Sequence, residues 1–270
     1  MQILIPILLL TGVAVVCAVL LTLSDKFFGV KEDEKYTAIR DCLPGANCGA
    51  CGYSGCDGYA KALANGSTST ANLCVPGGDK TASEIAALIG VEAEDVVEKV
   101  AYVACNGTCD AVERKYDRSG SKSCHTANLL YSGDKACNFA CLGYGDCVKV
   151  CPQNAISIEN GVARVDPRKC IGCGICARQC PNNIIKIVND TTRVVVECSN
   201  HEKGAITRKQ CKNGCIGCMK CEKTCPHGAI KVENNLATIN YELCTGCAAC
   251  VEVCPVHCIH EGNFICGAHF

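Results

Sequence analysis

The chain has 270 residues and 29 cysteines, and this share of more than a tenth exceeds the cysteine usage of an ordinary globular domain. Aromatic residues make up 5% of the chain and Trp is absent, which leaves too few large apolar side chains for a conventional core. We therefore expect groups bound by the thiols to cross-link the chain, and the chain without them to fold poorly. The formal net charge is −1, and no nucleic-acid partner is expected.

The first predicted element is an uncharged run at residues 3–23, about 20 residues long, which is enough to cross a membrane as a helix. Lys26, Lys31 and Lys35 follow the run and no Lys or Arg precedes it, so the rest of the chain is predicted to be cytoplasmic. A signal peptide would need a positive start and a small-residue cleavage site, and both are missing. The sequence predicts a single-pass anchor in the cell membrane at residues 1–25 and a polar linker at 26–41.

A small cysteine-rich domain is predicted at residues 42–80, because glycines there let the backbone wrap closely around a bound group. Its four thiols suit one [4Fe-4S] cluster, and they are Cys48, Cys51, Cys56 and Cys74. A connector follows at 81–136. In it, Thr81 and Glu84 predict a capping box for a helix through Ile89, residues 95–99 predict a further helical turn, and residues 100–104 predict a strand.

Two copies of one module follow, at residues 137–197 and 198–270. Each copy contains two Cys-Pro pairs 29 residues apart, at Cys151 and Cys180 and again at Cys225 and Cys254. Short strand pairs separate the cysteine runs, at 155–158 with 162–165 and at 229–232 with 237–239. The predicted fold class is α+β, with an N-terminal transmembrane helix, a small [4Fe-4S] domain and tandem bacterial-type ferredoxin-like modules.

The cysteine spacing C-x2-C-x2-C-x3-C-P is the ligand run of bacterial ferredoxins with two [4Fe-4S] clusters, in which the fourth Cys of each run binds the other cluster. The second module has two complete runs. One predicted ligand set is Cys215, Cys218, Cys221 and Cys254, and the other is Cys225, Cys244, Cys247 and Cys250. Zinc is a weak alternative, because three thiols so closely spaced overcrowd a tetrahedral site. A disulfide framework is also disfavoured by this spacing.

The first module has one full set and one that lacks a thiol. The full set is Cys151, Cys170, Cys173 and Cys176. The other contains Cys141, Cys147 and Cys180, with Tyr144 in the place of the missing Cys, and Cys137 is the expected substitute. Five thiols then remain for a sixth cluster, namely Cys105, Cys109, Cys124, Cys198 and Cys211, of which Cys105, Cys109 and Cys124 are the preferred ligands. Five clusters and this sixth are predicted.

Other features of the sequence predict no catalytic residue on this chain. There is no G-x-G-x-x-G at a strand–helix junction, no P-loop and no metal-type pairing among the histidines. Cys42, Cys258 and Cys266 are expected not to be ligands, and Cys258 occupies a position that is small or apolar in the other runs. Basic residues near the modules either compensate the negative clusters or steer an acidic redox partner.

Three motifs together resemble RnfB, the ferredoxin-like component of the Rnf complex, in the long, polyferredoxin form of anaerobic bacteria. They are the apolar N-terminal run, LPGANCGACGYSGC with LCVPGG, and the tandem runs ending in CTGCAACVEVCPVHCI. The resemblance covers essentially the whole chain. It departs from the pattern at Tyr144, which leaves the ligands of that set open.

The resemblance implies an electron-transfer subunit of a membrane-bound, ion-translocating ferredoxin:NAD+ oxidoreductase. Such a subunit would accept electrons from soluble reduced ferredoxin and pass them to the membrane subunits, while flavin and NAD would be bound by other Rnf subunits. The pumped ion, Na+ or H+, is not indicated. The alternatives are a membrane-anchored polyferredoxin that serves another oxidoreductase, and a structural zinc protein without redox activity.

Overall fold

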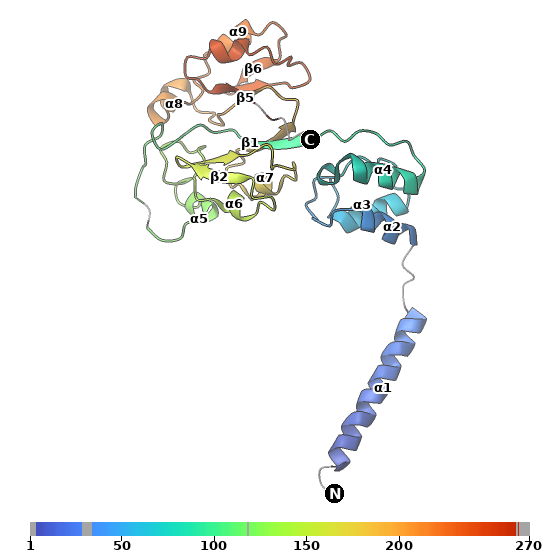
Figure 1. Ribbon diagram of the computed structural model, residues 1–270. Coiled ribbons are helices and arrows are strands. Elements are labelled where there is room, and N and C mark those ends of the chain that lie inside the picture. Colours follow the sequence, from blue (N-terminus) through green and yellow to red (C-terminus); the bar gives the residue numbers. More distant parts are fainter. Residues whose placement is uncertain (1–3, 29–33, 118, 263, 265–270) are drawn as a thin grey trace.

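The computed structural model describes residues 4–28, 34–117, 119–262 and 264, with the side chains of the first helix described over residues 11–23. Within this part of the chain the secondary structure consists of short helices and two-stranded sheets, so the α+β class is confirmed. Figure 1 shows the helix α1 (Leu4–Phe28), a helical domain, and two modules built around small sheets.

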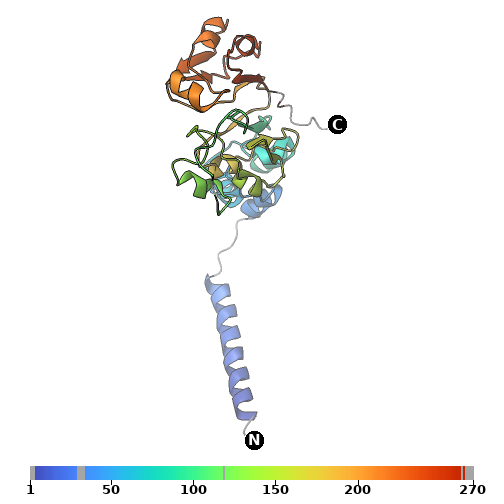
Figure 2. The ribbon, with the colours of Figure 1, turned by 90° about the vertical axis from the view of Figure 1, so that its left-hand side faces the viewer.

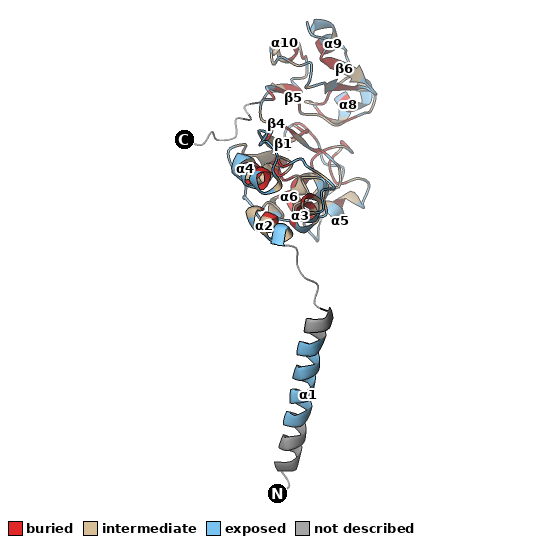
Figure 3. Cartoon of the chain, turned by 90° about the vertical axis from the view of Figure 1, so that its right-hand side faces the viewer, coloured by how far each residue is buried: buried red, intermediate tan, exposed pale blue. Residues whose placement is uncertain are grey.

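Helix α1 covers most of the predicted apolar run. Its described side chains are all exposed, including Val13, Val16 and Leu21 (Figure 3). Among the residues that the structure describes, no helix meets both the length and the hydropathy needed to cross a membrane. The helix itself therefore agrees with the sequence analysis, and its transmembrane role finds no support in the structure.

The N-terminal domain consists of α2 (Glu34–Cys42), α3 (Cys56–Ala64), the 3-10 turn η1 (Val75–Gly77) and α4 (Gly78–Ile89). The polar linker predicted at 26–41 is wrong in its second part, because α2 buries Ile39 completely against Tyr59 and Leu63. The predicted capping box is also wrong. Helix α4 begins three residues before Thr81, with Gly77 at its N-cap and no side-chain capping bond, and it ends at the left-handed Gly90.

The first module contains two antiparallel pairs, β1 (Lys99–Val103) with β4 (Ile185–Asn189) and β2 (Ile156–Glu159) with β3 (Val162–Val165). The helices α5 (Cys124–Asn128), α6 (Asp146–Lys149) and α7 (Ile175–Gln179) lie beside these sheets. The strand predicted at 100–104 is confirmed as β1. The helical turn predicted at 95–99 is wrong, since residues 91–98 have no regular structure and β1 starts at Lys99.

The second module repeats this plan. Strand β5 (Val194–Val196) pairs with β8 (Ile259–Glu261), and β6 (Ile230–Glu233) pairs with β7 (Leu236–Ile239). The helices are α8 (Gly204–Gln210), α9 (Lys220–Thr224) and α10 (Ala249–Glu252). Both inner hairpins match the predicted strand pairs. Their two-residue turns have left-handed residues at Asn160 and Gly161 and at Asn234 and Asn235, as type I′ turns require.

The outer sheets β1–β4 and β5–β8 reach outside the simple repeat units. Strand β1 belongs to the first module although it lies in the predicted connector, and β5 belongs to the second module although the predicted boundary follows it. The first module contacts both other parts, through Arg178, which donates to the carbonyl of Cys48, and through Asn106, whose N–H donates to Glu197 at 3.0 Å. Figures 1 and 2 show the second module at one end of this assembly.

Candidate iron-sulfur sites

Six groups of four thiols are named sites A to F. Each group is recognised by the thiols that share a pocket or that act on one another's pKa. Site A holds Cys48, Cys51, Cys56 and Cys74; site B holds Cys151, Cys170, Cys173 and Cys176; site C holds Cys124, Cys141, Cys147 and Cys180; site D holds Cys105, Cys137, Cys198 and Cys211; site E holds Cys215, Cys218, Cys221 and Cys254; and site F holds Cys225, Cys244, Cys247 and Cys250.

Sites B, E and F gather the thiols that the ferredoxin spacing groups together. A residue with positive φ precedes the short helix in each run, at Gly174 (70°), Met219 (58°) and Ala248 (60°). This left-handed residue turns the chain so that the third Cys of the run lies in the first helical turn. The cost of that conformation is smallest for glycine, so Met219 and Ala248 are held there by the surrounding fold.

Each of these short helices also joins two sites. Helix α9 carries Cys221 of site E and is followed directly by Cys225 of site F, while α10 carries Cys250 of site F and precedes Cys254 of site E. In the first module α7 carries Cys176 of site B and is followed by Cys180 of site C. The crossed ligand pattern therefore follows from the length of one short helix.

Site A forms in a loop that precedes α3. The side chain of Asn47 accepts a hydrogen bond from the backbone N–H of Cys56 at 2.8 Å, which closes the loop. Gly55 has φ 98°, and a Cβ at this position would lie 2.9 Å from the Asn47 oxygen, so a larger residue is excluded. Burial, followed by the neighbouring thiols of Cys56, Cys48 and Cys51, raises the pKa of Cys74 to about 11.

Site C contains Cys124 where the sequence analysis expected Cys137. Burial raises the pKa of Cys147 to about 12, and the next contributions come from the thiols of Cys141, Cys124 and Cys180. The same thiols of site C line one pocket. Cys137 lies elsewhere, so the expectation that it completes this set is corrected.

Two contacts hold Cys124 in site C. The buried carboxylate of Asp146 accepts hydrogen bonds from the Ser123 hydroxyl at 2.7 Å and from the backbone N–H of His125 at 3.2 Å, and it thereby satisfies the start of α5. The His125 ring lies 2.9 Å from the carbonyl of Gln179, next to Cys180. The insertion is thus fastened beside both Cys147 and Cys180.

Tyr144, which replaces the expected ligand, is part of a separate polar group. Its hydroxyl donates to the Asp134 carboxylate at 3.0 Å, and Arg114 pairs with the same oxygen at 3.1 Å. The missing thiol is therefore compensated from the insertion, and the tyrosine is retained as a structural contact.

Site D joins the two modules. Its members come from the end of β1, the segment before α6, the end of β5 and the end of α8, and they line one pocket. Burial raises the pKa of Cys137 to about 11 and that of Cys198 to about 12, and Cys105 is among the thiols that act on both. Of the three ligands preferred for the sixth cluster, the structure places only Cys105 here. Cys109 is exposed and belongs to none of the six sites.

Hydrogen bonds to sulfur test whether these residues fit [4Fe-4S] clusters, since thiolate ligands accept N–H bonds and a cluster's potential depends on them. In site B, Ala101 donates to Cys170 at 3.4 Å and Ala155 donates to Cys151 at 3.3 Å. In site D, the backbone of Gly107 donates to Cys105 at 3.4 Å and the Asn200 amide donates to Cys137 at 3.4 Å. Four thiols, one for each iron, with donors aimed at the sulfurs fit such clusters.

Single metal ions need a tighter arrangement than a cluster does. Over residues 4–28, 34–117, 119–262 and 264, no three His, Cys, Asp or Glu side chains are grouped closely enough to hold one ion. Because burial raises the pKa of most of these thiols, cluster binding must release protons.

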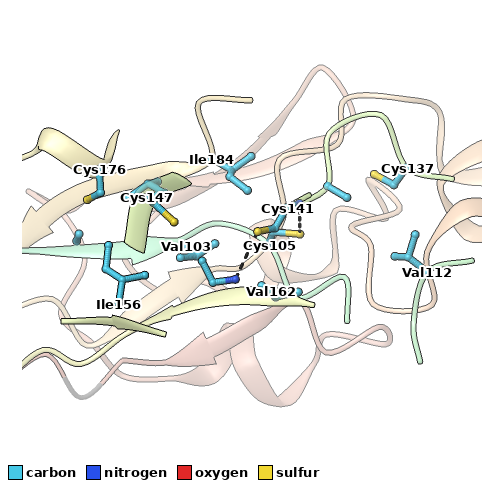
Figure 4. Close-up of a cluster of buried hydrophobic side chains, with 14 of the residues drawn as sticks. Val103, Cys105, Val112, Cys137, Cys141, Cys147, Ile156, Val162, Cys176 and Ile184 are labelled. Carbon is cyan, nitrogen blue, oxygen red and sulfur yellow. Dashed lines mark hydrogen bonds between the residues drawn. The ribbon is translucent and has the colours of Figure 1, made fainter. Parts of the chain in front are cut away.

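Neighbouring sites touch one another through their ligands. Cys48 of site A raises the pKa of Cys173 in site B, after the larger effect of burial, and Cys176 of site B does the same to Cys147 in site C. The backbone N–H of Cys141 in site C donates to the sulfur of Cys105 in site D at 3.3 Å. Figure 4 shows Cys176, Cys147, Cys141, Cys105 and Cys137 following one another through the core of the first module.

The succession continues into the second module. The backbone N–H of Cys215 in site E donates to the sulfur of Cys198 in site D at 3.3 Å. Helices α9 and α10 then join site E to site F. The six sites therefore form a single file, in the order A, B, C, D, E, F.

The remaining cysteines lie outside the sites, in keeping with their sequence assignment where the structure describes them. Cys42 ends α2 and its thiol donates to the Ala38 carbonyl at 3.3 Å. Cys258 is buried beside site E, and its hydrogen bonds lower the pKa of Cys254 to about 5 and that of Cys215 to about 6. Cys266 lies outside the described residues.

Comparison with known proteins places this arrangement in a family. Three family models match: a putative Fe-S cluster domain at residues 43–76, a 4Fe-4S binding domain at 163–186 and a 4Fe-4S dicluster domain at 205–260. The chain is 42% identical to the B subunit of the Na+-translocating ferredoxin:NAD+ oxidoreductase complex of Acetobacterium woodii, over 95% of this chain and 77% of that protein. The chain belongs to the RnfB family.

Two further members of the family have similar identity. The B subunit of the proton-translocating ferredoxin:NAD+ oxidoreductase complex of Clostridium ljungdahlii is 38% identical over 88% of this chain and 84% of its own length. The B subunit of the ion-translocating oxidoreductase complex of Methanosarcina acetivorans is 38% identical over 88% of this chain and 90% of its own length. The resemblance to RnfB is thereby confirmed.

The family models cover the sites unevenly. The matched segments contain all ligands of sites A, E and F and three of the four thiols of site B. Only Cys180 of site C and Cys211 of site D lie inside them. Sites C and D, which link the modules of this RnfB chain, are therefore the part that the structure adds to the family description.

Proposed function

We propose that this RnfB chain accepts electrons from reduced ferredoxin and passes them to the other subunits of an ion-translocating ferredoxin:NAD+ oxidoreductase complex. Family membership and the ferredoxin-type domains support an electron-transfer role in such a complex. The observation that carries the proposal is the single file of four-thiol sites, because a relay needs neighbouring redox centres without a gap.

Sites A to F are proposed to hold one [4Fe-4S] cluster each, which gives six clusters and about 24 irons per chain. The clusters supply reversible one-electron chemistry, with potentials that the protein sets through charge, burial and hydrogen bonds. The chain's own residues hold the thiolates and donate N–H groups to them. Lys135, almost fully buried, donates to the carbonyls of Gly107 and Gly161 at 2.7 and 2.8 Å, and it places a positive charge beside Cys141 and Cys211.

Flavin, NAD and the pumped ion are proposed to be bound by other subunits. The relatives named for Na+ and for protons have similar identity to this chain, so similarity does not select the ion.

The chain is proposed to work at the cell membrane, with its six sites on the cytoplasmic side. The support is physical: the exposed Val and Leu side chains of α1 lose contact with water only if lipid or another subunit covers them, and many cysteines suit a reducing compartment. We expect a chain that lacks residues 1–28 to move from the membrane fraction to the supernatant while its iron content stays the same. Retention of the truncated chain on washed membranes would contradict a role of α1 in attachment.

Deletion of the gene in its host tests the function. Membranes without this chain are expected to lose NAD+ reduction by reduced ferredoxin, and wild-type protein supplied in trans should restore it. Tagged chain, purified anaerobically, should be brown and carry flavin-containing subunits with it. Activity that persists after deletion, or co-purification with a different oxidoreductase, would overturn the proposal.

A further inference from the structure

Cys258 is a buried thiol that the relay assignment does not use. It is 1% exposed, and its sulfur lies 3.6 Å from the sulfur of Cys254 in site E. It also has a hydrogen bond with Cys215, the first ligand of the same site. A side chain that contacts two ligands of one site, and that is not itself one of the four, can affect that site without binding iron.

The repeat supplies an internal comparison for this position. Four residues after the Cys of each Cys-Pro pair stand Ala155 in site B, Ile184 in site C, Ala229 in site F and Cys258 in site E. All four side chains are buried. Only Cys258 carries a hydrogen-bond donor on its side chain.

The backbone at this position does not explain the difference. The N–H of Ala155 donates to Cys151 at 3.3 Å, and the N–H of Cys258 donates to Cys254 at 3.4 Å. The side-chain S–H is thus an addition to a hydrogen bond that is already present in the equivalent site. In this dry interior an added donor toward sulfur acts with little screening by water.

We propose that the S–H group of Cys258 donates to the ligand sulfurs of site E and raises the reduction potential of its cluster above that of the equivalent sites. Reduction adds negative charge to the cluster and its thiolates, and a donor stabilises that charge more in the reduced state. Cys258 is a positioning residue in this role, and site E becomes the preferred resting place of an electron within the second module. The inference rests on the proposed ligand assignment of site E.

A redox titration followed by EPR on the anaerobically purified full chain tests the inference. Cys258→Ala, which copies Ala155 and Ala229, should keep all its iron and sulfide. One cluster should become harder to reduce by about tenfold in its equilibrium constant, or about 59 mV for one electron. Cys258→Ser keeps a donor and should shift less. Cys42→Ala, which removes a non-ligand thiol from another domain, should shift nothing.

The gain of a donor gives the complementary test. Ala229→Cys should raise the potential of a cluster that Cys258→Ala leaves unchanged, because it places the same donor beside site F. Unchanged potentials in Cys258→Ala at full iron content would overturn the inference while leaving the six sites in place. Loss of about four irons in Cys258→Ala would show a ligand role and overturn both the inference and the assignment of site E.

Discussion

Replacing Cys124 with Ala is expected to cost the chain about four irons, whereas replacing Cys109 with Ala is expected to cost none. Both cysteines lie in the same insertion, only 15 residues apart in sequence. Their surroundings differ: Cys124 lies in the pocket of site C with three other thiols, and Cys109 is exposed. Cys109→Ala is therefore a matched control from the same segment, and iron, sulfide and EPR measurements of anaerobic protein provide the readout.

A double substitution separates the structure from the sequence expectation. If Cys124 and Cys137 serve different sites, Cys124→Ala with Cys137→Ala should lose about eight irons, the sum of the two single losses. If Cys137 completed the set of Cys141, Cys147 and Cys180, the double variant would lose no more than Cys137→Ala alone. Equal losses in the double and single variants would thus refute the assignment of Cys124 to site C.

The sequence was sufficient for sites whose ligands follow the local spacing. Cys244, Cys247 and Cys250 lie within one turn and one short helix, so their grouping depends on local backbone geometry, and the Cys-Pro of the neighbouring run supplies the fourth thiol. The repeat also predicted the hairpins, because an alternating apolar pattern beside Asn and Gly turn residues specifies them locally.

The sequence was not sufficient where ligands come from distant segments. Cys124 enters site C because Asp146 and Gln179 receive α5, and neither contact has a spacing rule that could reveal it. The same holds for Cys137, which lies four residues before Cys141 in sequence but packs against Cys105 and Cys211. The helix α2 was missed for a related reason: its composition is polar, and only the burial of Ile39 by α3 makes its position favourable.

Replacing Cys198 with Ala is expected to interrupt the relay at its middle. Cys198 and Cys105 are the members of site D whose sulfurs accept backbone bonds from the ligands of sites E and C, at 3.3 Å in each case. Site D is therefore the junction between the two modules. Without it, the variant should keep about 20 irons, because the other five sites retain all their thiols. NAD+ reduction by reduced ferredoxin should fall to the level of membranes that lack the chain.

The junction also has a structural role that the experiment must separate from electron transfer. Arg164 pairs with Glu197 at 3.1 Å and donates to Asn106 at 2.7 Å, and the Ser199 hydroxyl donates to the Ala104 carbonyl at 2.9 Å. These contacts hold the modules together independently of the Cys198 thiol, so EPR signals from the five remaining clusters should persist in the variant. Full activity with site D lost would place that site off the path, and the single file would then have to branch around it.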